Sequence, residues 1–420
     1  MRRANGKPAI LVVGQGATHT GYSRVLHSVL AHLHQRYEIH HFALGYDKKS
    51  EETRWQIYAN QSPGDKLGVE QLRPLVQRIR PKLVLLLEDI WLFPFHLKIL
   101  AEFRNRLRVI LYCPIEDNAL PPTIVESINT ADRVFVFNKC GQAVLEKTIE
   151  EIRREHPEFW FPLIGIIPHG VDVSQFYPLA RSFAAFDGRA SRALARRLLF
   201  GGEAEDPDGF IVLNANRHRP RKRLDITVQG FSAFASGKPK NVKLYLHTGV
   251  DEIKPNLVYI AKQYGIAERL LPVDPLQDHP CVSDQRLNLL YNACDVGINT
   301  GKSEAWGLVS FEHAATGAAQ IVPGHGVYKE LWEGAAIMLE TVGYGNKRDD
   351  LIERHVTPEG VADALEELYR DRNLLQRLST AAYARATRRE YAWSSIAERW
   401  DQVFSSLIEE GWRLGLERMP

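Results

Sequence analysis

Two acidic side chains flank a glycine at a predicted helix start in the second half of the chain. The stretch KSEAWGLVSFEHAATGAAQIVP places Glu304 in the loop after a short predicted strand, Asp295–Asn299, and Glu312 inside the helix that follows, with Gly307 between them. A helix N-terminus presents unpaired backbone N–H groups and a partial positive charge, so it binds phosphate readily. Ionised carboxylates accept hydrogen bonds from hydroxyl groups. The stretch therefore suits a ligand with both phosphate and hydroxyl groups, such as a sugar nucleotide.

An ordinary structural interpretation of these two glutamates has to be set beside this one. Acids around an amphipathic helix are usually a cap partner and a solvated surface residue, and the spacing alone would not decide between the two interpretations. The wider string SEAWGLVSFEHAATGAAQIVPGHGVYKE, however, resembles the signature of the retaining GT-B glycosyltransferases of family GT4. The matching positions are Glu304, Gly307, Leu308, Glu312, Ala314, Gly317, Val322, Gly326 and Glu330.

The resemblance implies roles for individual residues of this stretch. Glu304 would contact the donor sugar, and Glu312 would bind the ribose hydroxyls. The residues at the helix start, Trp306, Gly307 and Leu308, would complete the donor contacts. The sequence departs from the family pattern at Ala305, Trp306 and His313, where Gly, Phe and Ala are usual, and none of these changes removes a charged group.

A short basic segment, NANRHRPRKRLDITVQGF, follows the predicted strand Phe210–Asn214. Its Arg217 and Lys222 match the GT4 element in which two cations neutralise the donor diphosphate. The physical reason is that fixed positive charges stabilise the charge that builds on a leaving diphosphate. A basic cluster can also bind nucleic acid, but this segment is short and lacks interleaved aromatic residues, so we expect no nucleic-acid partner.

The first predicted strand runs into a glycine-rich turn, GQGATHTGYSR. The turn is not a clean G-x-G-x-x-G motif, so a dinucleotide cofactor is only weakly supported. One interpretation is a turn that merely lets strand and helix pack closely. The resemblance implies the other, in which the backbone at Gly16 and Gly21 approaches the donor phosphates.

Adjacent acids follow two predicted strands of the first half. Glu116 and Asp117 come after the strand Val109–Tyr112, and Glu88 and Asp89 come after Leu83–Leu87. Carboxyl ends of parallel strands are where ligands bind, so Glu116 and Asp117 are candidates for assisting the acceptor. Capping of a loop is the structural alternative for Asp117. Many family members have a His-Asp or similar pair near this point, and its absence here puts a catalytic histidine in doubt.

The segment IIPHGVDVSQFYPLA resembles the family motif that leads into the interdomain linker. We therefore predict an acceptor domain over residues 1–180, a donor domain over 181–392 and a C-terminal helix over 393–420 that packs back on the first domain. His169 and Asp172 could line a cleft, but shaping of the linker turn is favoured for both.

Short apolar runs alternate with helical patterns along the whole chain, which predicts two parallel sheets covered on both faces. The predicted strands are Ala9–Val13, Glu38–Ala43, Leu83–Leu87, Val109–Tyr112, Arg133–Phe137, Leu163–Pro168, Phe210–Asn214, Val242–His247, Leu270–Val273, Asp295–Asn299, Ala319–Val322 and Ala336–Leu339. The predicted fold is GT-B, two Rossmann-like α/β domains facing across a cleft.

Composition fits an ordinary soluble protein of about two domains, with 45% hydrophobic and 25% charged residues among 420 and a net charge of +2. Four scattered cysteines, Cys113, Cys140, Cys281 and Cys294, favour neither a zinc site nor a disulfide framework, and a reducing cytosol is the simplest fit. Basic residues precede an apolar run that is too short for a signal sequence. We expect a cytoplasmic location, with peripheral contact at the inner membrane face left open.

The predicted activity is transfer of a sugar from a nucleotide-diphosphate sugar to an acceptor hydroxyl with retention of configuration. No cofactor and no metal are expected, and the acids of Asp206-Pro207-Asp208 are discounted as a metal motif. A phosphorylase, an epimerase and a non-catalytic nucleotide-sugar-binding protein are the alternatives. The donor base, the acceptor and the oligomeric state are left open.

Overall fold

The computed structural model describes residues 6–416 except 17–19, 47–52, 61, 63, 117–119, 181–187, 201–208, 249–255, 272–281 and 345–352. The chain divides into two compact units. Unit 1 holds residues 1–170 together with 393–420, and unit 2 holds residues 171–392. The first division lies before the predicted boundary at residue 180. Residues just after it are anchored in unit 2, because the backbone N–H of Tyr177 donates to Asn288 Oδ1 (3.0 Å) and that of Leu179 to Asn292 Oδ1 (3.1 Å).

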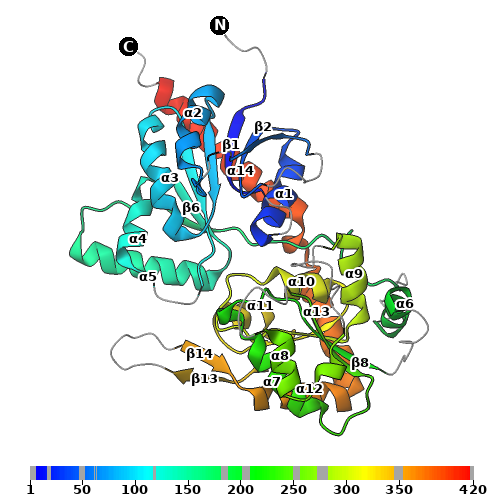
Figure 1. Ribbon diagram of the computed structural model, residues 1–420. Coiled ribbons are helices and arrows are strands. Elements are labelled where there is room, and N and C mark those ends of the chain that lie inside the picture. Colours follow the sequence, from blue (N-terminus) through cyan, green and yellow to red (C-terminus); the bar gives the residue numbers. More distant parts are fainter. Residues whose placement is uncertain are drawn as a thin grey trace. The chain divides into compact units, whose positions relative to one another are not determined.

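Unit 1 is built on a seven-stranded parallel sheet with the order β3-β2-β1-β4-β5-β6-β7 (Figure 1). The central strands β1, β4 and β5 are nearly continuous apolar runs, as expected for strands buried on both faces. The strands are β1 (Ala9–Gln15), β2 (Glu38–Leu44), β3 (Gln56–Ala59), β4 (Leu83–Leu87), β5 (Arg108–Tyr112), β6 (Arg133–Val136) and β7 (Ile164–Ile166).

Helices cover this sheet, and the last helix of the chain returns to it. The helices are α1 (Gly21–Leu33), α2 (Val69–Ile79), α3 (Phe93–Leu100), α4 (Pro122–Glu126), α5 (Lys139–Glu155) and α14 (Trp393–Leu416). On α14, the buried Trp400 ring lies 4.9 Å from Tyr112 and 5.2 Å from Phe135, centroid to centroid. Asp401 accepts a hydrogen bond from Tyr37 Oη at 2.7 Å. The predicted return of the C-terminal helix to the first sheet is therefore confirmed.

Unit 2 contains a five-stranded parallel sheet with the order β12-β11-β10-β8-β9 and a separate antiparallel hairpin. Its strands are β8 (Phe210–Asn214), β9 (Val242–Leu246), β10 (Val296–Ile298), β11 (Ala319–Pro323), β12 (Ile337–Leu339), β13 (Thr341–Tyr344) and β14 (Glu353–Val356). Its helices are α6 (Gly188–Phe200), α7 (Leu224–Ala235), α8 (Leu257–Gln263), α9 (Asp284–Ala293), α10 (Leu308–Ala315), α11 (Gly326–Trp332), α12 (Pro358–Arg370) and α13 (Arg372–Ala386).

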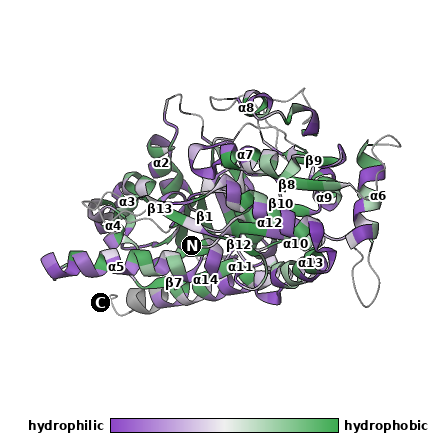
Figure 2. Ribbon diagram, turned by 90° about the horizontal axis from the view of Figure 1, so that it is seen from below, coloured by the Kyte–Doolittle hydropathy of each residue, from purple (hydrophilic) through white to green (hydrophobic). Residues whose placement is uncertain are grey.

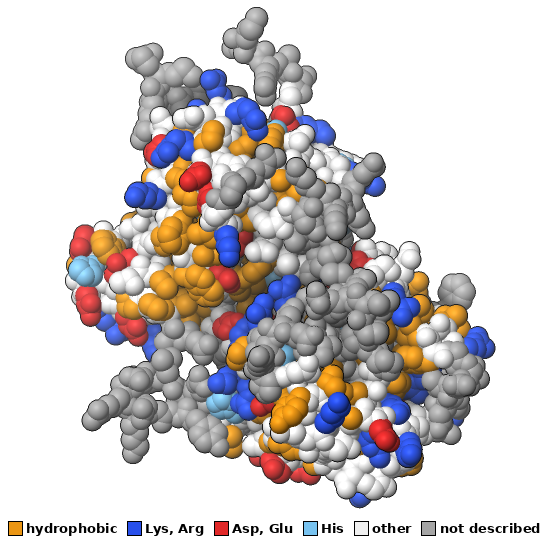
Figure 3. All heavy atoms as spheres, viewed as in Figure 1, with side chains coloured by type: hydrophobic (Ala, Val, Ile, Leu, Met, Phe, Trp, Pro, Cys, Tyr) orange, Lys and Arg blue, Asp and Glu red, His pale blue; other side chains and the backbone are white. Residues whose placement is uncertain are grey.

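Apolar residues concentrate on the strands, whereas the helices carry polar and apolar residues along their length (Figure 2). This is the pattern of sheets covered by amphipathic helices. Apolar side chains also reach the surface of unit 1, where they gather over α3 and α4 (Figure 3). The large exposed ones near α3 include Trp91 and Phe95, at 54% and 52% exposure.

The predicted strand Leu270–Val273 is wrong in the part that the structure describes. Leu270 forms only an isolated bridge to Leu244, and no strand element includes it. The bridge does add Leu270 to the apolar packing of this unit, since it lies against the core of buried residues around β9. Within the described residues this run therefore forms a single bridge to β9 and no strand.

A buried ion cluster fixes α6 against the sheet of unit 2. The carboxylate of Asp295 accepts from Arg192 Nε at 2.9 Å and from Arg196 Nη2 at 2.6 Å. The same carboxylate accepts from the backbone N–H of Ile211 on β8 at 2.7 Å. The side chains of Arg192, Arg196 and Asp295 are 12%, 4% and 6% exposed, so the pairs lie largely out of water.

Replacing the shared carboxylate should therefore destabilise unit 2 strongly. Asp295→Ala leaves two buried guanidinium groups without their counter-charge, and removing one partner of a buried pair costs about 3–5 kcal/mol. Hydrogen exchange of the β8 amides would measure the loss. The matched control is Glu333→Ala, which breaks an exposed pair with Lys329 (59% and 69% exposed) and should cost no more than about 1 kcal/mol. Equal protection in the two variants would contradict the assignment.

Candidate nucleotide-sugar site

Two loops of unit 2 converge beyond the carboxyl ends of the neighbouring parallel strands β8 and β10. The first loop ends in a short helical turn, Pro220–Lys222, and carries Lys222. The second follows β10 and carries Glu304. Arg223 closes the first loop with a left-handed backbone (φ 47°), which lets α7 begin at the next residue. Carboxyl ends of parallel strands are the usual ligand edge of such sheets.

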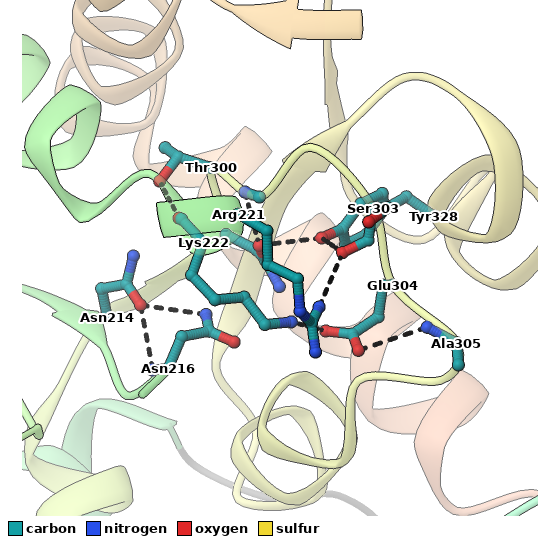
Figure 4. A network of polar contacts seen from close by, with 11 residues as sticks. Asn214, Asn216, Arg221, Lys222, Thr300, Ser303, Glu304, Ala305 and Tyr328 are labelled. Carbon is teal, nitrogen blue, oxygen red and sulfur yellow. Dashed lines mark hydrogen bonds and ion pairs between the residues drawn. The ribbon is translucent and has the colours of Figure 1, made fainter. Parts of the chain in front are cut away.

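Lys222 and Glu304 form an ion pair between these loops (Figure 4). Their side chains are 8% and 12% exposed, so both charges are mostly removed from water. The second carboxylate oxygen of Glu304 accepts from the backbone N–H of Ala305 at 3.3 Å. Burial alone would raise the pKa of Glu304, but the nearby charges of Lys222 and Arg221 outweigh it and hold the pKa below its usual value. Glu304 is therefore a fixed anion at neutral pH.

Backbone contacts hold the two loops together independently of that pair. Thr300 Oγ1 lies 3.2 Å from the carbonyl oxygen of Lys222 and 2.8 Å from that of Arg223, and donates toward them. The backbone N–H of Lys302 donates to the carbonyl of Arg221 at 2.8 Å. Thr227 on α7 lies 2.8 Å from Thr300, hydroxyl to hydroxyl, and accepts from Asn214 Nδ2 at 2.9 Å. The position of Lys222 is thus set by a buried polar network.

A second group of contacts shapes the loop that carries Glu304. Tyr328 Oη donates toward Asn299 Oδ1 at 3.2 Å and toward the carbonyl of Ser303 at 3.3 Å. Asn299 Oδ1 also accepts from the backbone N–H of Gly301 at 2.9 Å. A Cβ atom at Gly301 would lie 2.6 Å from Tyr328 Oη, so glycine is required at this position. The loop is therefore tightly packed from both sides.

Helix α10 begins directly after this loop. Its N-cap residue, Gly307, has φ 86°, a left-handed conformation that favours glycine. Leu308 is the first helical residue, and Glu312 lies further along the helix, 4% exposed and accepting from Tyr291 Oη at 3.4 Å. The loop acid and the helix start thus occur as predicted, and the donor contacts of Gly307, Leu308 and Glu312 stay predictions.

The ring of Trp306 packs inside unit 2. It is 4% exposed and stacks on Phe311 with a centroid distance of 5.0 Å. Tyr391 meets it edge-on at 5.5 Å. These contacts give the ring a packing role next to the site, where it supports the turn into α10. A direct contact between Trp306 and the donor stays a prediction.

The arginine beside the ion pair is Arg221, and the predicted contact of Arg217 with the donor diphosphate stays a prediction. Arg217 is an exposed residue of the first loop, whereas Arg221 donates from Nη1 to the carbonyl of Ser303 at 3.2 Å and lowers the pKa of Glu304. Figure 4 shows Arg221 and Lys222 approaching Glu304 together. Asn216 is also part of the network, since its Nδ2 donates to Asn214 Oδ1 at 2.9 Å. The motif spacing pointed to Arg217 and gave no reason to select Arg221.

The predicted residues of the first half belong to unit 1. Gly16 packs against β2, where its backbone N–H donates to the carbonyl of Leu44 at 2.8 Å and a Cβ atom would lie 2.3 Å from that of Ala43. This supports the structural interpretation of the glycine-rich turn. Gly21 is the exposed first residue of α1. Glu116 is half-buried after β5, and Asp117 lies outside the described residues.

Within the described part of the chain, no group of three or more His, Cys, Asp or Glu side chains is arranged to hold a metal ion. Asp206 and Asp208, the discounted metal motif, lie outside that part. Among the helices that the structure describes, none is long and apolar enough to cross a membrane.

The arrangement of two parallel sheets with a returning C-terminal helix is the GT-B fold, and solved structures share it. Sucrose-phosphate synthase from Thermosynechococcus elongatus matches 96% of this chain and 100% of its own at a TM-score of 0.68 and 16% identity. Anabaena HepE, solved in complex with UDP and glucose, matches 95% of this chain and 100% of its own, with a TM-score of 0.68 and 16% identity. The glycosyltransferase WaaG matches 94% of this chain and 99% of its own, with a TM-score of 0.65 and 10% identity. At these identities the likeness shows the fold alone.

Sequence relatives are glycosyltransferases as well, which confirms the predicted resemblance to this class. Mannosylfructose-phosphate synthase of Agrobacterium fabrum is 24% identical over 63% of this chain and 53% of its own length. D-inositol 3-phosphate glycosyltransferase of Streptomyces griseus is 25% identical over 59% of this chain and 49% of its own length. The matched region thus spans about half the length of these curated relatives. No family model matches the chain.

The lowered pKa of Glu304 predicts a pH dependence of stability. Its usual pKa is 4.5, and a depressed pKa means that the pair stabilises the folded state fully above that value and loses its effect as pH falls through the lowered pKa. Glu304→Gln should therefore cost more unfolding free energy at pH 7 than at acid pH. Chemical denaturation of both proteins across this range would measure it. Glu340→Gln, at an exposed position, is the control, and a loss in Glu304→Gln that did not change with pH would contradict the prediction.

Proposed function

We propose that the chain is a retaining glycosyltransferase of the GT4 kind, which transfers a sugar from a nucleotide-diphosphate sugar to an acceptor hydroxyl without a metal ion. The observation that carries the proposal is the buried Lys222–Glu304 pair at the strand ends, with Arg221 beside it and the α10 N-terminus following. This arrangement combines cations for a diphosphate with a fixed anion for sugar hydroxyls. Buried, preorganised charges of this kind act where charge develops in a transition state.

In the proposed reaction the acceptor oxygen attacks the anomeric carbon from the face that the diphosphate leaves. The bond from the anomeric carbon to the phosphate oxygen breaks as the new glycosidic bond forms, and its electron pair goes to the departing diphosphate. A diphosphate oxygen then takes the acceptor's proton. Lys222, with Arg217 or Arg221, would stabilise the charge on the diphosphate, and Glu304 would bind the donor sugar. Glu116 and Asp117 are kept as proposals for assisting the acceptor.

Comparison with known proteins supports a nucleotide-sugar donor. HepE, which has the same fold, was solved with UDP and glucose, and both sequence relatives carry the names of sugar-transferring enzymes. A phosphorylase would need inorganic phosphate and an epimerase would need no acceptor, so product analysis separates both from a transferase. A non-catalytic binding protein would show no turnover.

A cytoplasmic location is proposed in preference to peripheral contact with a membrane. Basic residues of α2, which are of the kind that contacts an anionic membrane surface, have partners on the protein. Arg73 donates to Glu102, with Nε 2.9 Å from Oε2, and the Arg78 guanidinium lies 5.0 Å from the Tyr58 ring centroid. These contacts favour a solvated protein surface at this place over a membrane-binding patch.

Removing the buried cation should abolish most of the activity. Lys222→Ala takes away one preorganised charge stabiliser, and such losses lower turnover by about 100-fold or more. Steady-state assays with the preferred nucleotide sugar would measure it. Lys240→Ala, at an exposed lysine of the same unit, is the matched control and should keep full activity. Turnover like that of the wild type in a folded Lys222→Ala variant would refute the diphosphate assignment.

Binding of the donor nucleotide should stabilise the protein. A thermal-shift titration with UDP, GDP, ADP and TDP, each alone and as sugar conjugates, tests this directly. A ligand that binds only the folded state adds about 2.7 kcal/mol at about 100 times its Kd. A response to one nucleotide would identify the donor base. Silence of all of them at millimolar concentration would contradict the donor assignment and favour a protein without this function.

A further inference from the structure

Unit 1 contains a cavity of about 410 Å³ that the donor assignment does not use. It lies beyond the carboxyl ends of β1, β2 and β4, next to the loop that leads into α2. Its volume is in the lower part of the range of small-molecule sites, about 300–1,000 Å³. The polar side chains that line it include Gln15, Tyr46, Asn60, Asp65, Lys66 and Glu88.

Glu88, directly after β4, is a buried residue of the cavity lining. This side chain is 1% exposed, and its Oε1 atom has no hydrogen-bond partner among the described residues. The neighbouring carboxylate, Asp89, is by contrast bonded by the Tyr22 hydroxyl. A buried polar atom without a partner is costly and normally finds one in a ligand or a water molecule. Glu88 therefore marks a position where a bound molecule would gain a hydrogen bond.

The protonation state of Glu88 indicates which kind of molecule the cavity would bind. Burial, together with the charge of Asp89, raises the pKa of Glu88 to about 8. At neutral pH most of the carboxyl groups are then protonated, and a protonated carboxyl both donates and accepts hydrogen bonds. A hydroxyl group of a ligand does the same. The pairing of these two groups needs no counter-charge.

The charges around the cavity argue against a phosphate group. Among the described lining residues Lys66 is the single cation, and it is exposed. The carboxylate of Asp65 lies in the same lining and accepts from the backbone N–H of Glu70 at 2.9 Å. Recognition of phosphate normally uses arginines in bidentate geometry or several converging N–H groups. This lining offers mainly amide, hydroxyl and carboxyl groups.

We propose that this cavity binds an unphosphorylated, hydroxyl-rich molecule of sugar size, with Glu88 hydrogen-bonded to one of its hydroxyl groups. Its role as the acceptor site rests on the proposed function, whereas the binding itself does not. The molecule could be a free sugar or the terminal unit of a longer glycan, since both present the same hydroxyl groups.

Binding can be measured on the full chain without any nucleotide. Calorimetric titration, supported by saturation-transfer NMR for weak binding, would compare glucose and mannose with their 6-phosphates and with maltose and methyl mannoside. We expect the neutral sugars to bind at least about tenfold more tightly than the phosphates, because a phosphate group would lose water next to carboxyl groups without gaining a buried cation among the described lining residues. Tighter binding of maltose or the glycoside than of the free sugars would identify a glycan end. Tighter binding of the phosphates, or no binding of any sugar at millimolar concentration, would overturn the proposal.

Variants connect the binding to the cavity. Glu88→Ala should weaken it at least about tenfold, whereas Glu88→Gln, which keeps one donor and one acceptor, should stay within a few fold of the wild type. Gln15→Ala, at the end of β1, tests the same cavity if Glu88→Ala fails to fold. Glu150→Ala, at an exposed acid of α5, is the matched control. Unchanged binding in Glu88→Ala, or in Gln15→Ala where the former does not fold, would overturn the assignment.

The result separates this proposal from the proposed function. Neutral sugars that bind through Glu88 in a protein that transfers no sugar from any nucleotide donor would leave the cavity assigned and refute the transferase. Transfer without sugar binding in this cavity would do the reverse.

Discussion

Unit 2 depends on one electrostatic constraint at the edge of its sheet, the pairing of a buried ammonium with a buried carboxylate. Either charge alone would be destabilising in its place, because burying an isolated ion costs several kcal/mol. Lys222 and Glu304 come from loops that follow different strands, so the pair can form only if β8 and β10 are neighbours in the correct register. The threonine and asparagine contacts beneath the pair set that register without using charge. The fold and the site are therefore specified together.

The two charged groups of the pair are also of the kinds that bind a sugar nucleotide. A lysine ammonium carries three donors, and an ionised carboxylate accepts at several positions. The charge of Arg221 also acts on the Glu304 carboxylate, and its guanidinium donates a hydrogen bond to the backbone carbonyl of Ser303. A diphosphate that entered here would meet cations whose geometry is already fixed. Little reorganisation would then be needed as charge develops on the leaving group.

The sequence predicted the strands well where burial on both faces produced continuous apolar runs, as in Leu83–Leu87 and Phe210–Asn214, which match β4 and β8 residue for residue. It missed β3, whose residues are exposed or half-buried and carry no such run, and it misjudged Leu270, which is half-buried and forms only an isolated bridge. The two loops that carry the site were predicted from motif order. The position of Arg221 beside the pair was not predictable, because it depends on a loop conformation set by contacts to Thr300 and Lys302.

Glu88 and Glu304 show why residue type alone does not define a role. Both follow short parallel strands, and both are largely removed from water. Burial raises the pKa of both carboxyl groups and so favours the neutral acid. In Glu304 two cations reverse that effect, whereas in Glu88 the nearest charge is another carboxylate, which reinforces it. The first side chain is thus suited to stabilise positive charge and the second to exchange hydrogen bonds with a neutral hydroxyl group. A sequence shows both as an acid after a strand, and only the charges that the fold brings near each one distinguish them.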